Sequence, residues 1–277
     1  MQPTSDPHQA RTDALFHIAF YQFVRLDDVD QVVLDLRTLS AGLLGSVLVA
    51  PEGINGVLAG TADALDAFQQ ALQRDRRFGQ IAFKRSACVT APFGRIRVHK
   101  KSEIVYMGVD NIDAVRKTGV AVSPQQWRAL IAADDVVVID NRNSFEYRLG
   151  RFNHAVDPQV ANFRDFPRYI EANAPAWKAA GKRVALYCTG GIRCEKTSAW
   201  MDDMGIPVYQ LDGGILNYFL SMPDAEKDWQ GECFVFDNRI ALDTRLQETA
   251  TTLDEVYEAE PDGAWRLERA RRLDQSR

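Results

Sequence analysis

The residues with the clearest chemical potential lie in the segment Cys188-Thr-Gly-Gly-Ile-Arg-Cys194. An apolar run from Val184 to Tyr187 precedes this segment and a helical pattern follows it, so we expect a strand, a loop and a helix in that order. The loop N–H groups and the positive end of the helix dipole favour an anion at the centre of the loop. The Cys188 thiolate can be that anion, because helix N-termini and nearby cations lower a cysteine pKa from about 8.5.

Each residue of this loop has an expected part. Cys188 is the predicted catalytic nucleophile, although a buried cysteine can also simply close a strand. Glycine allows the tight turn that aims N–H groups inward. The guanidinium of Arg193 can organise the loop or hold an incoming anion, and both roles can apply. The predicted anion-binding loop comprises Thr189, Gly190, Gly191, Ile192 and Arg193.

A second thiol and a group of charged residues could support this site. Cys194 could resolve a sulfur intermediate as a disulfide partner, but packing in the first turn of the helix is the favoured interpretation. Asp140, Arg142 and Glu146 follow an apolar strand, and we expect them to brace the loop through ion pairs rather than to react. The histidines have no metal-ligand spacing, so no metal site is predicted.

Length and composition indicate two soluble domains. The chain has 277 residues, 46% of them hydrophobic and 26% charged, and it contains no run of about 18 apolar residues that could span a membrane. Its polar first residues lack the apolar core of a secretory signal, and residues 1–14 are expected to form a disordered tail. Four cysteines without such a signal favour the reducing cytoplasm.

The pattern of residues 15–90 is β-α-β-β-α-β, which is typical of a ferredoxin-like α+β domain. Strands are expected over 17–26, on both sides of a turn within 46–60, and over 79–89, with helices over 27–45 and 61–75. Residues 91–120 are mixed in pattern and are expected to be a connector that packs partly on both domains.

Residues 121–225 are expected to form an α/β domain with a central parallel sheet. A Ser123-Pro124 pair suits a helix start, and apolar strands alternate with helical segments. Active groups should lie beyond the carboxyl ends of these strands. The C-terminal extension, residues 226–277, is expected to be charged and largely disordered at its end.

One segment differs in charge from the rest of the chain. The formal net charge is −5, yet between Arg74 and Lys101 nine lysines and arginines face the single acid Asp75, a local net charge of +8. Such a segment can contact nucleic acid or can be an ordinary solvated face, and charge alone does not decide between them.

Three landmarks in order resemble the rhodanese domain: Asp140-Asn-Arg142 with Glu146-Tyr147, the Cys188 loop, and Leu211-Asp-Gly213-Gly214. More narrowly, the strings APEGINGVLAG, SFEYRLGRF, CTGGIRCEK, YQLDGGILNYF and WQGECFVFD are similar to the rhodanese-domain family of tRNA uridine-34 hydroxylases. The resemblance extends from Phe16 to Asp237. Gly150-Arg151 stands where typical rhodanese sequences carry histidine, and the cysteine-rich tail of longer relatives is absent.

The resemblance implies oxygen-dependent formation of 5-hydroxyuridine at the wobble position of tRNA. Molecular oxygen would be the co-substrate, the reductant is unknown, and Cys188 would act as a thiolate or persulfide. No flavin fingerprint or metal-ligand spacing is found in the sequence. An unstacked base of the anticodon loop would enter the cysteine pocket. The candidate contacts to tRNA phosphates are Arg95, Arg97, Lys100 and Lys101.

The leading alternative is a sulfurtransferase that moves sulfane sulfur through Cys188. It would need neither the N-terminal domain nor the basic segment, so these features favour tRNA modification. A cysteine phosphatase places five residues between cysteine and arginine, whereas four intervene here. A non-catalytic binding module would not need the loop cysteine.

Overall fold

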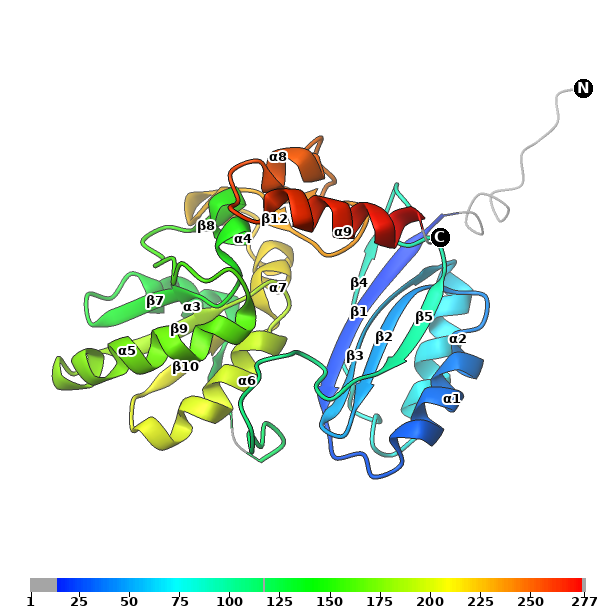
Figure 1. Cartoon of the computed structure of the whole chain (residues 1–277), viewed down its shortest axis with the longest axis horizontal. Coiled ribbons are helices and arrows are strands. Elements are labelled where there is room, and N and C mark those ends of the chain that lie inside the picture. Colours follow the sequence, from blue (N-terminus) through cyan, green and yellow to red (C-terminus); the bar gives the residue numbers. More distant parts are fainter. Residues whose placement is uncertain (1–13, 117, 276–277) are drawn as a thin grey trace, which may run out of the picture. The chain divides into compact units, whose positions relative to one another are not determined.

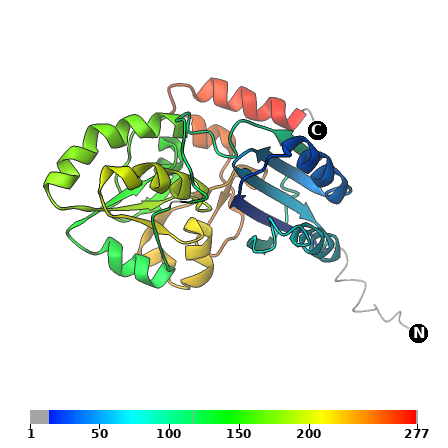
Figure 2. The ribbon, with the colours of Figure 1, turned by 90° about the horizontal axis from the view of Figure 1, so that it is seen from below.

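The computed structural model describes residues 14–116 and 118–275, which form two compact units (Figures 1 and 2). Unit 1 runs to Ile104 and includes Asp237–Arg239, and unit 2 holds Val105–Phe236 and Ile240–Leu273. Most of the expected N-terminal tail, residues 1–13, lies outside the described residues.

Unit 1 is a five-stranded sheet with two helices on one face (Figure 1). The strand order is β4-β1-β3-β2-β5. Strand β1 pairs antiparallel with β4 and with β3, and β3 pairs antiparallel with β2. This arrangement confirms the predicted ferredoxin-like fold. The elements are β1 (Phe16–Phe23), α1 (Val29–Leu39), β2 (Leu44–Ala50), β3 (Gly53–Gly60), α2 (Ala62–Gln73), β4 (Phe83–Ala87) and β5 (Ile96–Lys100).

Alternation along the strands builds the core of unit 1. Ile18 and Phe20 of β1 point toward the helices and pack with Leu65 and Phe68 of α2. The hairpin between β2 and β3 requires glycine at position 53, where φ is +144° and a Cβ would meet the Gln22 carbonyl oxygen at 2.0 Å. The sequence predicted both the hairpin and the helix that follows it.

Strand β5 lies inside the segment that was expected to be a connector. It pairs in parallel with β2, and Val98 is buried in the core of unit 1. The expected domain boundary after residue 90 is therefore too early, because the sheet continues to Lys100. Two apolar residues, Ile96 and Val98, alternate with cations, so charge concealed a short strand that is apolar on one side.

Unit 2 contains the parallel sheet that the sequence predicted. Its strands lie in the order β6-β10-β9-β7. Helices α3 and α7 cover one face, and α5 and α6 cover the other (Figure 2). The strands and helices of this layered core are β6 (Val120–Val122), α3 (Pro124–Ile131), β7 (Val136–Asp140), α5 (Phe166–Ala179), β9 (Arg183–Tyr187), α6 (Ile192–Met201), β10 (Val208–Leu211) and α7 (Gly214–Ser221).

Smaller elements surround this core. They are α4 (Ser144–Leu149), β8 (Gly150–Phe152), β11 (Trp229–Gly231), β12 (Cys233–Phe234), β13 (Ala241–Leu242), α8 (Leu253–Tyr257), α9 (Gly263–Gln275) and the 3₁₀ helices Phe163–Asp165, Asp202–Met204 and Ala225–Lys227. Strand β8 pairs with β11, and β12 pairs with β13. Among the described residues, none of the helices has the length and apolar character of a membrane span.

The C-terminal extension is folded through most of its length, which contradicts the disorder expected at its end. Val256 and Tyr257 of α8 pack with Phe145 and Phe234, and Leu267 of α9 joins them. The guanidinium of Arg266 donates to the Ala161 carbonyl at 2.7 Å. The apolar residues are too sparse along the chain to predict a core, because their partners come from distant segments.

Candidate active site

The Cys188 loop lies between β9 and α6, at the carboxyl end of a central strand, as the sequence predicted. Cys188 directly follows β9, and Ile192 begins α6. Gly191 precedes the helix with a left-handed φ of 103°. This conformation directs its N–H to the Cys188 sulfur, with a distance of 3.1 Å between Gly191 N and Cys188 Sγ. The loop thus contributes a backbone donor to the thiolate.

A second helix N-terminus fixes the other side of the loop. The N–H of Ile215 in α7 donates to the Cys188 carbonyl at 3.0 Å, and that of Leu216 donates to the Thr189 carbonyl at 3.2 Å. Gly214 has a φ of +69°, and a Cβ on it would meet the Cys188 carbonyl oxygen at 2.4 Å. The glycine pair of the third rhodanese landmark therefore allows α7 to approach the loop.

Cys188 and Cys194 form a coupled pair of thiols, each 1% exposed. Burial tends to raise the pKa of Cys188, but hydrogen bonds from Cys194, the Arg193 charge and the Gly191 N–H outweigh burial and hold that pKa well below its ordinary value. Burial, followed by the hydrogen bond to Cys188 and the negative charge there, raises the pKa of Cys194 well above its ordinary value. The opposite directions of the two pKa shifts favour the negative charge on Cys188 rather than on Cys194.

Arg193 is held by Glu146 through both of its terminal nitrogens. Arg193 Nη1 and Nη2 donate to the Glu146 carboxylate at 2.8 and 2.9 Å, and Nη2 also donates to Thr189 Oγ1 at 3.3 Å. Burial would raise the pKa of Glu146, but the charge and hydrogen bonds of Arg193, the Arg142 charge and the Asn143 N–H together outweigh burial, and the pKa is lowered. Arg193 thus links Glu146 to the Thr189 side chain of the loop, and its charge also lowers the pKa of Cys188.

A second buried ion pair closes the end of β7. Arg142 Nε and Nη2 donate to the Asp140 carboxylate at 2.8 and 2.6 Å, and Nη2 also donates to the Gly150 carbonyl at 2.6 Å. The guanidinium lies over the rings of Tyr187 and Trp229. Both charged side chains are 0% exposed. Asp140, Arg142 and Glu146 thus have the geometry of braces.

The four cations that we expected to contact tRNA lie in unit 1, on or beside β5. Lys100 Nζ forms an ion pair with Asp30 of α1 at 2.8 Å, so it lies on the helix side of the sheet. Side chains alternate along a strand, which places Arg97 and Lys101 on the opposite face. Arg95 is exposed just before the strand.

Sequence reasoning missed two polar residues near the thiols. The Asn141 side chain donates to Thr197 Oγ1 at 2.9 Å and hydrogen-bonds Cys194. Lys196 is 1% exposed, and its Nζ donates to the Val105 carbonyl at 3.1 Å. Both residues lie inside the motifs on which the family resemblance rests. Asn141 lies between Asp140 and Arg142, and Lys196 is the last residue of CTGGIRCEK. Their positions in these motifs could have identified them as candidate site residues.

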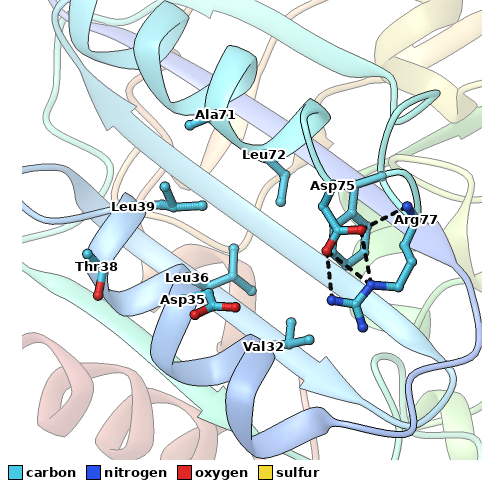
Figure 3. Close-up of a pocket in the computed structure, with 10 residues that line it drawn as sticks. Val32, Asp35, Leu36, Thr38, Leu39, Ala71, Leu72, Asp75 and Arg77 are labelled. Carbon is cyan, nitrogen blue, oxygen red and sulfur yellow. Dashed lines mark hydrogen bonds and ion pairs between the residues drawn. The ribbon is translucent and has the colours of Figure 1, made fainter.

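Within the described residues, neither a metal cluster nor the hollow found in unit 1 adds to this site. In residues 14–116 and 118–275, no group of three or more histidine, cysteine or acidic side chains is arranged to hold a metal ion. A hollow of about 320 Å³ lies between α1 and α2 (Figure 3). Val32, Leu36 and Leu72 line it, and the Asp75–Arg77 ion pair stands at one end. These lining residues belong to unit 1, whereas the cysteine loop belongs to unit 2.

Comparisons with known proteins match each of the two units to a protein family, and the matched region of unit 2 contains the cysteine loop. Residues 16–104 match a family described as the UPF0176 acylphosphatase like domain, and residues 123–220 match the rhodanese-like domain. The chain is 47% identical over 238 residues to the tRNA uridine(34) hydroxylase of Synechococcus elongatus, covering 84% of this chain and 87% of that protein. It is 40% identical over 245 residues to the tRNA uridine(34) hydroxylase of Legionella pneumophila, covering 87% of this chain and 96% of that protein. The chain therefore belongs to the tRNA uridine(34) hydroxylase family.

Proposed function

We propose that this protein hydroxylates C5 of uridine 34 in tRNA, with molecular oxygen as co-substrate, and that it works in the cytoplasm. The observation that carries the proposal is the buried Cys188, with the N–H of Gly191 on its sulfur and the N–H of Ile215 on its carbonyl, in a chain that is similar over most of its length to proteins named for this activity. Position 34 lies in the anticodon loop, where an unstacked base can enter a protein site.

The stoichiometry of the reaction sets what the site must do. Hydroxylation converts the C5–H bond of uracil to C5–OH with one atom of O₂. Reducing the second atom to water takes two further electrons and two protons. A thiolate close to the base is suited to this chemistry, because the thiolate is the reactive form of cysteine and can itself be oxidised.

The face of the unit 1 sheet opposite α1 and α2 is the proposed tRNA surface. Arg97 and Lys101 alternate with the buried Val98, so they point to this face. Tyr21 of β1 shares the face, and Lys84 Nζ lies 5.7 Å from the centre of its ring. Cations attract phosphates and aromatic rings stack on bases, the combination that binds single-stranded RNA.

The proposed activity predicts a loss of 5-hydroxyuridine when Cys188 is changed. Deleting the gene should remove 5-hydroxyuridine and its derivatives from wobble uridines, and a Cys188→Ala copy should not restore them. Mass spectrometry of digested tRNA measures both. A Cys88→Ala copy is the matched control and should restore the modification. Unchanged modification after deletion, or full rescue by Cys188→Ala, would contradict the proposal.

The sheet face predicts an unequal effect of the basic residues. Neutralising Arg97 and Lys101 should weaken tRNA binding and lower the slope of log K against log salt by about one for each phosphate that is no longer bound. Lys100→Ala should have the smaller effect, since Asp30 already engages this lysine. Filter-binding titrations across a salt series test this. Equal effects of all three changes, or affinity independent of salt, would contradict the proposed surface.

A sulfurtransferase is the second candidate, because residues 123–220 match the rhodanese-like domain and Cys188 is held as a thiolate. Thiosulfate would donate sulfane sulfur to Cys188, and a thiol acceptor would then remove it. Sulfur transfer at full rate by a protein that leaves tRNA unmodified would favour this function over hydroxylation.

A further inference from the structure

Cys188 and Cys194 are two thiols of one buried cluster on the same side of the unit 2 sheet. The Cys194 side chain and backbone N–H interact with the Cys188 sulfur and lower the pKa of Cys188. Both residues are almost fully buried in one core. Cys88 belongs to unit 1, while the buried Cys233 is engaged with the Phe234 carbonyl at 3.7 Å. A thiolate and a thiol in contact can together release two electrons and form a disulfide.

The hydroxylation needs two electrons beyond those that uridine itself provides. The sequence identifies no reductant, whereas the site contains a pair of thiols that can provide both electrons. We propose that Cys188 accepts the second oxygen atom of O₂ as a sulfenic acid and that Cys194 resolves this acid to a Cys188–Cys194 disulfide in each turnover. This inference rests on the proposed hydroxylase function.

The two steps balance. In the first, the O–O bond breaks, C5–H becomes C5–OH, and the Cys188 thiol becomes Cys–SOH, so that uridine and sulfur are each oxidised by two electrons and O₂ is reduced by four. In the second, the Cys194 sulfur attacks the Cys188 sulfur, the S–O bond breaks, an S–S bond forms and water leaves. Sulfenic acids condense with a neighbouring thiol in this way. An external dithiol then reduces the disulfide for the next turnover.

The surroundings of the sulfurs suit this sequence of events. The loop N–H of Gly191 and the charge of Arg193 stabilise anionic sulfur at Cys188. Asn141 is anchored by its hydrogen bond to Thr197 and interacts with Cys194, where it opposes the rise in the pKa of that thiol. Cys194 lies in the same buried cluster as Cys188, so it is positioned to react with the sulfenic acid before an external thiol does.

A single-turnover experiment with the full-length protein tests the inference. The protein is reduced, freed of external thiol and mixed with unmodified tRNA in oxygenated buffer. Mass spectrometry then measures 5-hydroxyuridine and the Cys188–Cys194 disulfide peptide. We expect the two products in equal amounts, and a large loss of disulfide when tRNA or oxygen is omitted.

A variant distinguishes the proposed role of Cys188 from that of Cys194. Cys194→Ser should accumulate sulfenic acid at Cys188, detected as a dimedone adduct after turnover, while the Cys88→Ser control should behave as the wild type. Formation of 5-hydroxyuridine with both thiols still reduced would overturn the inference and leave the proposed function standing. Absence of 5-hydroxyuridine in the wild type would overturn both. The disulfide measurement on the wild type needs no variant, so it holds even if Cys194→Ser fails to fold.

Discussion

At the scale of residues, the buried pair of Arg193 and Glu146 supports the cysteine loop. Glu146→Gln leaves the Arg193 guanidinium charge buried without a carboxylate. Removing one partner of a buried ion pair lowers the free energy of unfolding by about 3–5 kcal/mol. We therefore expect a large drop in the free energy of unfolding together with weaker hydroxylation. Urea denaturation followed by tryptophan fluorescence measures the first effect.

An exposed ion pair provides the control for this prediction. Asp30 and Lys100 are 2.8 Å apart, with side chains 81% and 55% exposed. Removing such a pair changes stability by less than about 1 kcal/mol, so Asp30→Asn should unfold near the wild-type midpoint. Because Asp30 lies in unit 1, this variant is followed by far-ultraviolet circular dichroism, which reports both units. Similar decreases in the free energy of unfolding for Glu146→Gln and Asp30→Asn would contradict a larger contribution of the buried Arg193–Glu146 pair to stability.

The reactive residue itself could be predicted from sequence, but its partners could not all be. Cys188 stands in a strand-loop-helix context whose glycines and Arg193 indicate an anion site. Packing was the favoured interpretation of Cys194, with a second reactive thiol as the alternative. The residue is buried in the core that also contains Cys188, and its interaction with the Cys188 sulfur lowers the pKa of Cys188. Asn141 reaches Cys194 from another strand end, and a contact between segments so distant in the chain leaves no spacing to recognise.

At the scale of elements, helix α7 fixes the cysteine loop because Gly214 lets it come close. Gly214→Ala would place a Cβ at 2.4 Å from the Cys188 carbonyl oxygen, so the loop must shift. Misplacement of a reacting group by about 1 Å can cost about 100-fold in rate. We expect a loss of that order in the rate of 5-hydroxyuridine formation, measured in single-turnover assays.

Gly181 is the matched control for this change. Its φ is +63°, close to the +69° of Gly214, and nothing lies within 4 Å of a Cβ built on it. Gly181→Ala should carry only the cost of a left-handed alanine, about 1–2 kcal/mol, with hydroxylation unchanged. Equal losses of activity in the two variants would mean that backbone conformation, rather than the collision with the loop, decides the outcome.

Strand β5 and helices α8 and α9 were not predicted from the sequence, and the reason is the same for all three. Strand β5 exposes cations on one side, and helices α8 and α9 are mostly polar, so local composition favoured a connector and a disordered tail. Each is stabilised by apolar contacts with residues far along the chain, such as Val98 with the core of unit 1 and Tyr257 with Phe145. A capping box at Thr252 and Glu255 was a readable sign of α8.

At the scale of the whole molecule, the two units can be followed by different probes. All five tryptophans of the chain belong to unit 2: Trp127, Trp177, Trp200, Trp229 and Trp265. Tryptophan fluorescence therefore reports the unfolding of unit 2, whereas far-ultraviolet circular dichroism reports both units. A single free energy of unfolding is defined only if the two signals change together.

Removing residues 251–277 should destabilise unit 2. The change deletes Val256 and Tyr257, which are buried against Phe145 and Phe234; burial of each such side chain contributes about 1.5–3 kcal/mol. We expect a lower urea midpoint by tryptophan fluorescence and reduced hydroxylation. Trp265→Phe is the control, since Trp265 is 53% exposed in the same extension. An unchanged midpoint after truncation would contradict a supporting role for α8 and α9.

The packing of α8 and α9 on helix α4 also sets an order of events during synthesis. Helix α4 carries Phe145, which these last helices cover, and Glu146, which holds Arg193. Domains fold in turn from the N-terminus as the chain leaves the ribosome. The cysteine loop is thus translated well before its support is complete. A chain translated only as far as residue 250 should contain every residue of the loop and still lack the cover that α8 and α9 give to Phe145.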